Sequence, residues 1–386
     1  MIPYARQDIN QDDIDAVTQV LCSPFLTQGP EIPAFEQEVA QYCGVKHGVA
    51  FNSATSALHI ACLTLGLSSG GLLWTSPNSF VASANCALYC GAEVDFVDID
   101  PVTYNMSPIA LAKKLEKAKR EGRLPDVLVP VHFAGQSCDM RAIHELVSPY
   151  GIKIIEDASH AIGGKFNGIR IGSCDYCDIT IFSFHPVKII TSAEGGMAMT
   201  KDSSLANTMQ LLRSHGITRS PDMMQKKQQG KWYYEQIGLG YNYRMTDLQA
   251  ALGRSQLRRI DTFVKTRQAV AERYALQLDD CPLVLPHCIP EADSAWHLYS
   301  VCVQPDIPRM DRQSLYKSLH DAGILVNVHY IPIHIQPWYR SLGFKPGDFP
   351  CAEDYYSRCI SLPMYASLSL EEQKQVTDTL LSLLAA

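Results

Sequence analysis

The sequence of 386 residues predicts an α/β fold, with a large domain built on a mostly parallel sheet and a smaller α+β domain after it. Two observations support this prediction. Short apolar segments alternate with helical patterns between residues 49 and 184, as in a sheet whose strands are joined by helical crossovers. From about residue 281 the composition changes, and prolines at 282, 286 and 290 indicate a linker. We therefore predict a large domain with an N-terminal arm over 1–275, and a small domain over 276–386.

The individual elements follow from the spacing of apolar residues. Short β-branched or aromatic runs predict strands, and apolar residues three or four apart predict helices. In the large domain, strands are predicted at 49–52, 71–75, 93–99, 126–133, 153–157, 178–184 and 197–200. Helices are predicted there at 8–21, 34–43, 53–65, 79–90, 108–121, 140–150, 203–214 and 247–274. The small domain is expected to hold strands at 297–303 and 324–330 and helices at 311–322 and 371–384. The polar stretch 216–230 is a candidate for a mobile loop.

Composition and charge disfavour several classes of function. A net charge of −7 without a basic stripe gives no reason to expect nucleic acid or an acidic membrane as a partner. No apolar run is long enough to cross a bilayer, and the acidic first residues lack the pattern of a signal peptide. The 13 cysteines are scattered and odd in number, which indicates reduced thiols. We therefore expect a cytoplasmic protein.

Two kinds of site are also disfavoured by missing motifs. Cys174 and Cys177 form a C-x-x-C pair, but a zinc site needs a second pair of ligands and none follows nearby, so no metal is expected. No G-x-G-x-x-G follows a strand and no G-x-x-x-x-G-K-[ST] occurs, which argues against a dinucleotide-dependent oxidoreductase or a P-loop enzyme.

Lys188 is the first candidate catalytic residue. It follows a predicted buried strand, and its neighbours Val187, Ile189 and Ile190 are apolar. An amine in such surroundings is poorly solvated, so its pKa falls and it becomes nucleophilic enough to form a Schiff base. The alternative is a surface lysine on a hairpin, because a glycine pair follows and turns the chain into the next strand.

Other polar residues are predicted to lie near Lys188, because the carboxyl ends of parallel strands meet at one edge of a sheet, where ligands bind. Asp157 ends a buried strand and needs a cationic or hydrogen-bonding partner, such as a protonated pyridine nitrogen. Its alternative role is to cap the following segment. The hydroxyl-rich residues 53–56 open a helix, and the same geometry that caps a helix also binds phosphate. Most such caps are only caps.

Four separated motifs resemble the sugar aminotransferases of the DegT/DnrJ/StrS family, which have fold type I of the pyridoxal 5'-phosphate (PLP) enzymes. The similarity covers nearly the whole chain. The motifs are NSATSAL at 52–58, EDA at 156–158, SFHPVK at 183–188 with EGG at 194–196, and GYNYRM at 240–245.

The resemblance implies roles for the matching residues. Lys188 would form the internal aldimine with PLP and then transfer protons, and Asp157 would hold the pyridinium proton. Phe80 would stack on the cofactor ring. The other implied cofactor ligands are Ala54, Thr55 and Ser183 at the phosphate, His160 near the ring or its O3′, and Asn242 at the phosphate of the neighbouring subunit's cofactor. A site shared in this way implies a homodimer.

A narrower resemblance concerns the substrate. The segments LTQGP at 26–30, VHFAG at 131–135, SH at 159–160 and SFHPVK are similar to the family members of the pseudaminic acid pathway. Those enzymes move an amino group from L-glutamate to C4 of a UDP-4-keto-6-deoxy-N-acetyl hexosamine, UDP-2-acetamido-2,6-dideoxy-β-L-arabino-hexos-4-ulose. In relatives, the sugar-nucleotide site is lined by segments that here contain Tyr4, Gln28, His329, Tyr330 and His334. The alternative for these residues is a structural role in the small domain. For the glutamate carboxylates, Arg219 and Arg244 are only candidates.

The leading hypothesis is therefore a transaminase, and three alternatives stay open. Another 4-keto or 3-keto nucleotide sugar, such as a 4-keto-arabinose or 4-keto-glucosamine nucleotide, would differ only in the shape of the pocket. A PLP-dependent sugar dehydratase of the same fold would have a histidine in place of Lys188. A regulatory or binding protein that keeps the fold without catalysis would be expected to lack Lys188 or Asp157, and both are present.

Overall fold

A computed structural model describes residues 1–226, 230–305 and 311–385 of the chain. Within these residues, the largest sheet has seven strands. β10 is antiparallel to both of its neighbours, and the other adjacent pairs are parallel, which confirms the mostly parallel sheet. In spatial order the strands are β2 (His47–Phe51), β10 (Gly196–Thr200), β9 (Ile179–Ser183), β6 (Lys153–Asp157), β5 (Val127–Val129), β3 (Leu72–Thr75) and β4 (Glu93–Phe96).

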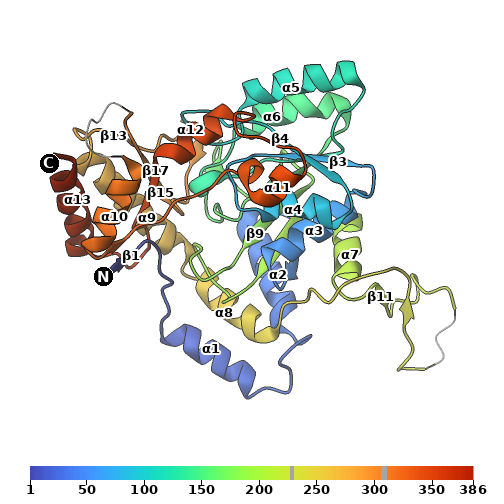
Figure 1. Ribbon diagram of the computed structural model, residues 1–386. Helices are drawn as coiled ribbons and strands as arrows, with labels where there is room; N and C mark the ends of the chain where they lie inside the picture. Colours follow the sequence, from blue (N-terminus) through green and yellow to red (C-terminus); the bar gives the residue numbers. More distant parts are fainter. Residues whose placement is uncertain (227–229, 306–310, 386) are drawn as a thin grey trace.

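Helices cover both faces of this sheet (Figure 1). Successive strand residues face opposite sides, so Ile155 and Ile181 belong to one core while Ile154 and Phe182 face the other side. The helices on the first side are α3 (Ala54–Thr64), α4 (Ala82–Tyr89) and α7 (Ser203–Leu212). The helices on the second side are α2 (Glu31–Cys43), α5 (Pro108–Glu121), α6 (Met140–Val147) and α8 (Asp247–Leu257).

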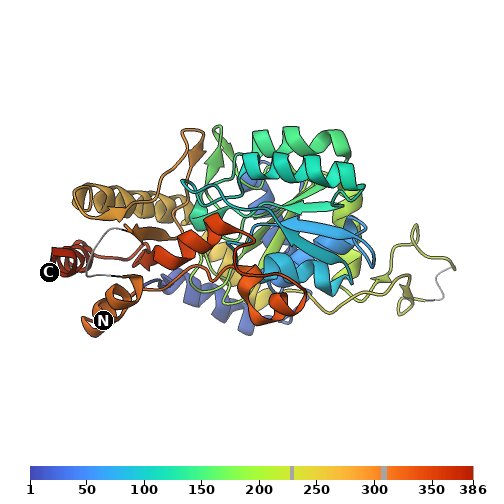
Figure 2. The same ribbon diagram turned by 45° about the horizontal axis from the view of Figure 1, so that its top comes forward.

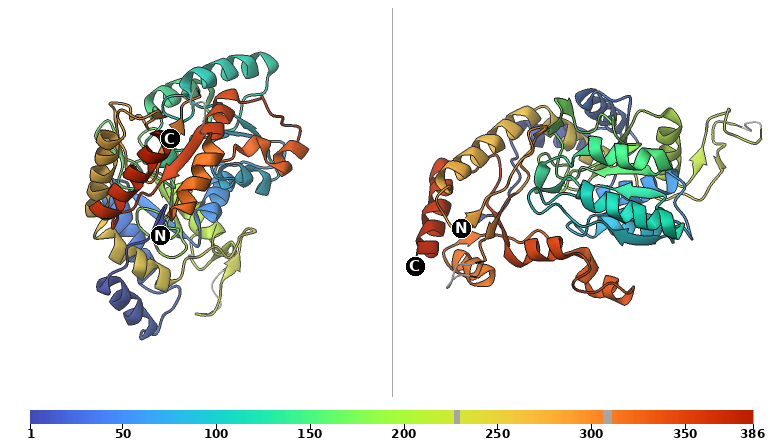
Figure 3. Two further views of the ribbon diagram at one scale, coloured as in Figure 1. Left: turned by 60° about the vertical axis from the view of Figure 1, so that its left-hand side comes forward. Right: turned by 90° about the horizontal axis from the view of Figure 1, so that it is seen from above.

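The prediction of a single helix at 247–274 is wrong, because the helical hydrogen bonding is interrupted between α8 and α9 (Ile260–Gln277). The start of α9 packs into the large core through Ile260 and Phe263, whereas its second half packs into another core through Val270 and Tyr274. Figure 3 shows α9 running from the large sheet towards α13. The predicted boundary at residue 275 falls inside this helix, and the division into two domains stays a prediction.

The C-terminal part of the chain contains a smaller sheet with helices beside it, and both chain termini lie on this side of the molecule (Figure 1). The strand predicted at 324–330 is only two residues long, because Val326 N–H turns back to Ile324 O. The elements of this part are β13 (Leu283–Val284), β15 (Tyr299–Val303), β17 (Cys359–Leu362), α10 (Arg312–Asp321), α13 (Leu370–Ala385) and β16 (Ile324–Leu325), which pairs with β1 (Ile2–Pro3).

The segment between β16 and β17 returns to the large domain. It contains a 3-10 helix, η3 (Ile333–Ile335), followed by α11 (Pro337–Ser341) and α12 (Pro350–Arg358). Tyr339 and Phe349 pack edge-on against Phe96 at the end of β4. The predicted small domain therefore contributes to both cores.

The remaining elements are short and peripheral. A hairpin of β11 (Ile217–Thr218) and β12 (Glu235–Gln236) projects away from the body (Figure 2). The predicted mobile stretch 216–230 includes residues 227–229, which lie outside the described residues. The other elements are β7 (Lys165–Phe166), β8 (Ile169–Arg170), β14 (Ala292–Asp293), η1 (Phe133–Gly135) and η2 (Ser148–Tyr150). None of the described helices has the length and apolar character needed to span a membrane, and all 13 cysteines are free thiols.

The N-terminal helix α1 (Gln11–Leu21) is attached to α8 through one buried carboxylate. Asp13 accepts hydrogen bonds from Ser255 Oγ at 2.6 Å, Gln256 Nε2 at 2.7 Å and the Arg259 guanidinium at 2.6 Å. It also closes a capping box with Asn10 at the start of the helix.

We predict that Asp13→Ala releases α1, because it removes the acceptor of the buried Ser255 hydroxyl and leaves Gln256 Nε2 and Arg259 with Asp8 alone, at a cost of about 1–3 kcal/mol. Limited proteolysis should then cut the first 30 residues faster than in the wild type, while the remainder stays resistant. The control is Asp15→Ala, which removes an exposed carboxylate bonded to Gln11. Equal cleavage of the Asp13→Ala variant and the wild type would contradict this account.

Candidate active site

One cavity of about 450 Å³ contains most of the predicted site residues. It lies where β6 and β9 end, and its lining comes from segments that are far apart in the sequence. Of the predicted residues, the cavity brings together Tyr4, Ala54, Thr55, Phe80, Asp157, His160, Ser183, Lys188, His329 and Tyr330. It is also lined by Ser53, Leu58, Ser79, Ala82, Val131, Ser159, His185, Val187, Glu194 and His297.

Lys188 lies in the connection between β9 and β10, where its N–H donates to His185 O at 2.9 Å. Its side chain is half-buried in the cavity. Burial lowers the pKa of the Lys188 amine to about 8, although the nearby Asp157 carboxylate acts in the opposite direction. About a tenth of the amine is therefore unprotonated, and nucleophilic, at pH 7.

Asp157 ends β6 on the side of the sheet that α3 and α4 cover, and only 4% of its surface is exposed. Its Oδ1 accepts the Ser159 N–H at 3.1 Å and the Ser159 hydroxyl at 2.6 Å. Its Oδ2 accepts the Ser83 hydroxyl at 2.6 Å. The carboxylate is thus held firmly at the wall of the cavity, where a ligand can meet it.

The start of α3 forms a second functional wall. Ser53 caps the helix by accepting the Ser56 N–H at 3.1 Å. The N–H groups of Ala54 and Thr55 belong to the first turn of the helix and therefore have no intrahelical acceptors. Gly196 of β10 lies so close beneath that a Cβ there would be 2.4 Å from the Ala54 nitrogen. A helix start with free N–H groups facing a cavity is suited to bind an anion such as phosphate.

Three imidazoles and a phenol form another part of the lining. Tyr330 Oη lies 3.1 Å from His160 Nε2, and the His160 and His297 ring centroids are 4.4 Å apart. Burial, with the nearby Lys188 charge as a further cause, lowers the pKa of His329 to about 3 and the pKa values of His160 and His297 well below their usual range. These imidazoles are neutral at physiological pH. Sequence reasoning missed His297, whose only signal was its place at the start of a predicted strand.

Three predicted site residues lie outside the cavity. The substrate role predicted for His334 does not fit its placement, because it is fully buried and its Nε2 lies 2.9 Å from Glu353 Oε1. Its ring packs edge-on against Phe349, away from Lys188. Gln28 and Asn242 are exposed on the surface.

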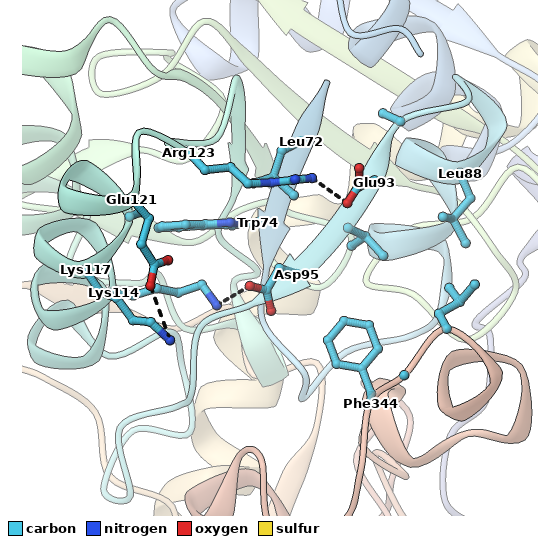
Figure 4. Close-up of a pocket in the computed structure, with 15 residues that line it drawn as sticks. Leu72, Trp74, Leu88, Glu93, Asp95, Lys114, Lys117, Glu121, Arg123 and Phe344 are labelled. Carbon is cyan, nitrogen blue, oxygen red and sulfur yellow. Dashed lines mark hydrogen bonds and ion pairs between the residues drawn. The ribbon is translucent and has the colours of Figure 1, made fainter. Parts of the chain in front are cut away.

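A larger cavity of about 640 Å³ lies elsewhere, beside the edge strand β4 (Figure 4). Its charged side chains form three ion pairs, which are Arg123–Glu93 at 2.5 Å, Lys114–Asp95 at 2.5 Å and Lys117–Glu121 at 3.9 Å. Each cation is matched by an acid, and no predicted site residue lies there. We therefore place the chemistry in the smaller cavity around Lys188.

Comparison with known proteins identifies the family. The DegT/DnrJ/EryC1/StrS aminotransferase family matches residues 7–381. The chain belongs to this family. It is 38% identical over 380 residues to the spore coat polysaccharide biosynthesis protein SpsC of Bacillus subtilis, an alignment that covers 98% of this chain and 95% of that protein. It is 36% identical over 385 residues to the UDP-4-amino-4,6-dideoxy-N-acetyl-β-L-altrosamine transaminase of Campylobacter jejuni, covering 100% and 98%.

Solved structures agree with this assignment. Helicobacter pylori PseC, an aminotransferase of pseudaminic acid biosynthesis, superimposes with a TM-score of 0.90 at 32% identity, covering 100% of this chain and 99% of that one. The protein Spr1654 of Streptococcus pneumoniae, in its PMP form, gives a TM-score of 0.90 at 28% identity, with the same coverage. This chain is accordingly a PLP-dependent sugar aminotransferase of fold type I. Among the described residues, no group of three or more potential ligands is arranged to hold a metal ion.

We predict that the reactivity of Lys188 follows its lowered pKa. Trapping of a small aromatic aldehyde on Nζ should increase from pH 6, where about 1% of an amine with a pKa of about 8 is unprotonated, and level off above pH 9. Borohydride reduction and peptide mass spectrometry would measure the adduct, with exposed lysines of the same protein as internal controls. Trapping on Lys188 that still increases beyond pH 10, as for an ordinary lysine, would contradict the prediction.

Proposed function

We propose that this enzyme transfers an amino group from L-glutamate to C4 of UDP-2-acetamido-2,6-dideoxy-β-L-arabino-hexos-4-ulose, with PLP bound covalently through Lys188. The main support is that the half-buried amine of Lys188 and the buried carboxylate of Asp157 line the same cavity. The substrate follows the activity for which the Campylobacter jejuni relative is named, and that relative aligns with the whole of this chain.

The residues of the cavity fit PLP. The helix start at Ala54 and Thr55, with Ser183 beside it, is suited to the phosphate, and Asp157 is suited to a protonated pyridine nitrogen. Phe80 is 58% exposed at the mouth of the cavity, so one face of its ring is free to stack. When bound, PLP supplies an electron sink that stabilises negative charge on the substrate carbon.

Lys188 then acts as the acid and base. A neutral Nζ accepts the proton from the α-carbon of glutamate in the first half-reaction, and in the second the protonated Nζ delivers a proton to C4 of the sugar, which carries none while it is a carbonyl carbon. A pKa of about 8 suits both directions of this transfer at neutral pH. The carboxylate of Asp157 keeps the cofactor nitrogen protonated throughout.

The substrates are anionic, but Lys188 is the only lysine or arginine among the described lining residues. The cations that bind the glutamate carboxylates and the sugar diphosphate must therefore come from another segment, for which Arg219 and Arg244 are candidates. The neutral wall of Tyr4, His329 and Tyr330 supplies hydrogen bonds to the sugar nucleotide.

We further propose that the active unit is a homodimer in which Asn242 binds the phosphate of the neighbouring subunit's PLP. Asn242 is exposed and lies outside the cavity of its own chain. It is held in place by an antiparallel bridge with Ser214. A residue placed in this way is available to a second copy.

A different nucleotide sugar is the second candidate substrate. The similarity to the Bacillus subtilis protein, named for spore coat polysaccharide synthesis, is as high as that to the altrosamine transaminase. Both candidates use the same chemistry and differ only in how the sugar fits.

Spectroscopy on the PLP-loaded enzyme separates these candidates. We expect L-glutamate to convert the cofactor to its amine form, and the UDP-linked 4-keto-altrosamine precursor to restore the original spectrum. Glutamate could convert the cofactor while this sugar fails to restore the spectrum and another 4-ketosugar nucleotide restores it. That result would support the transaminase activity and show that the substrate assignment is wrong. No response to glutamate would contradict the whole proposal.

The shared site predicts complementation between inactive variants. Lys188→Ala and Asn242→Ala should each be nearly inactive alone, but mixed dimers contain one intact site. A random mixture should therefore recover about a quarter of the wild-type activity. Lys188→Ala mixed with Asp157→Asn is the control, because both lesions belong to one chain's own cavity and no intact site forms. Absence of recovery with Asn242→Ala would contradict the shared site.

A further inference from the structure

Ser83 connects α4 to the carboxylate at the base of the active site. Its side chain is fully buried in the first turn of α4, between two alanines. Its hydroxyl lies 2.6 Å from Asp157 Oδ2 and 2.7 Å from the hydroxyl of Ser79. The first distance is typical of a hydroxyl that donates to a carboxylate, and the second of a hydrogen bond between neutral hydroxyls.

The direction of these bonds can be deduced. A serine hydroxyl has one hydrogen, and an ionised carboxylate only accepts. Ser83 therefore donates to Asp157 and must accept from Ser79. Ser79 lines the cavity, so a chain of hydrogen bonds runs from the cavity through Ser79 and Ser83 back to Asp157.

The number of hydrogen bonds that each oxygen accepts distinguishes the two carboxylate oxygens of Asp157. Each oxygen has about two acceptor positions. On Oδ1 both are filled, by the N–H and the hydroxyl of Ser159. Among the described residues, Ser83 is the one donor to Oδ2, which leaves that oxygen with one free position.

We propose that Ser83 is a positioning residue that presents Asp157 Oδ2 as the atom accepting the ring N–H of the cofactor. This inference rests on the proposed role of Asp157. Without the Ser83 hydroxyl, the carboxylate is fixed only at its Oδ1 end, so Oδ2 is free to turn away from the ring. Chains of hydrogen bonds in a dry interior also strengthen one another, so Ser79 supports the contact.

Ser83 also links the two groups that would hold the ring, which are Asp157 at the ring nitrogen and Phe80 on one face. Its backbone N–H donates to Phe80 O at 3.3 Å, which closes the turn that carries Phe80 to the mouth of the cavity. The turn that orients Asp157 is therefore the turn that places the stacking aromatic. Ser83→Ala keeps this backbone hydrogen bond and loses only the hydroxyl, so it should release Asp157 without moving Phe80 and change the tilt of the bound ring as well as its affinity.

The test compares Ser83→Ala, Ser83→Thr and the wild type, all loaded with PLP. Thr75→Val is the matched control, because it removes a fully buried hydroxyl that donates to Val129 O at 2.8 Å and has no contact with Asp157. The readouts are the dissociation constant of PLP, the visible circular dichroism of the bound cofactor, and kcat and KM for glutamate.

For Ser83→Ala we expect PLP to bind on the order of 10-fold more weakly, since a hydrogen bond to a charged group is lost. The visible circular dichroism should change, and kcat should fall while KM for glutamate stays nearly constant. Ser83→Thr should restore affinity and spectrum, and Thr75→Val should match the wild type.

Affinity and spectrum of Ser83→Ala equal to those of the wild type would overturn the proposal. So would equal losses in Ser83→Ala and Ser83→Thr, which would indicate packing and not the hydroxyl. If Ser83→Ala does not fold, Ser79→Ala decides: a weaker affinity with a changed spectrum supports the chain of hydrogen bonds, and wild-type behaviour overturns it. A wild-type protein that binds no PLP would instead refute the proposed function.

Discussion

The parallel pairing of β6 with β9 is the constraint on which the active site depends. In this pairing Asp157 lies opposite Ile181, two residues before β9 ends at Ser183. The chain leaving β9 therefore turns over the end of β6, which brings Lys188 to the cavity that Asp157 lines. A shift of one residue would direct Asp157 to the other face of the sheet, away from α3 and α4. The register of these two buried strands thus determines whether an amine and a carboxylate meet.

Burial then gives this pair its chemical character. Apart from the carboxylates of Asp157 and Glu194, the cavity walls are neutral imidazoles, two phenols, small hydroxyl residues and apolar side chains, so little surrounds Lys188 that would stabilise its charged form. The carboxylate of Asp157 is in a similar environment but has three hydrogen-bond donors. One environment therefore makes the amine reactive and keeps the carboxylate in place. The hydrogen-bond donors that Asp157 has and Lys188 lacks come from Ser83 of α4 and from Ser159 in the turn after β6.

The fold class and the centre of the site could be predicted from the sequence because both depend on local patterns. Strands alternate with helices, Asp157 and Ser183 lie at the ends of strands and Ala54 comes shortly after one, so a rule about sheet edges places them together. The break in the predicted helix at 247–274 could not be foreseen, because Leu257, Ile260 and Val264 continue the apolar spacing across it. Apolar spacing indicates which side chains are buried, but it does not show whether the backbone hydrogen bonds of a helix continue.

The remaining site residues depend on contacts that no local pattern contains. Ser83 is 74 positions from Asp157 in the chain, and only the packing of α4 on the sheet, against β3 and β4, brings their side chains together. His297 meets His160 only because the chain re-enters the large domain before β15. The spacing of His334 from His329 indicated a shared substrate site, but the 3-10 helix η3 directs the His334 side chain towards Glu353.

The covalent role of Lys188 is the central claim, and mapping the cofactor attachment tests it most directly. The protein is incubated with PLP, reduced with borohydride, digested and analysed by mass spectrometry. The account predicts a phosphopyridoxyl group on the peptide that contains Lys188, at close to one per chain, and none in Lys188→Ala. Stoichiometric labelling of a different lysine, or no label on Lys188 at saturating PLP, would contradict it.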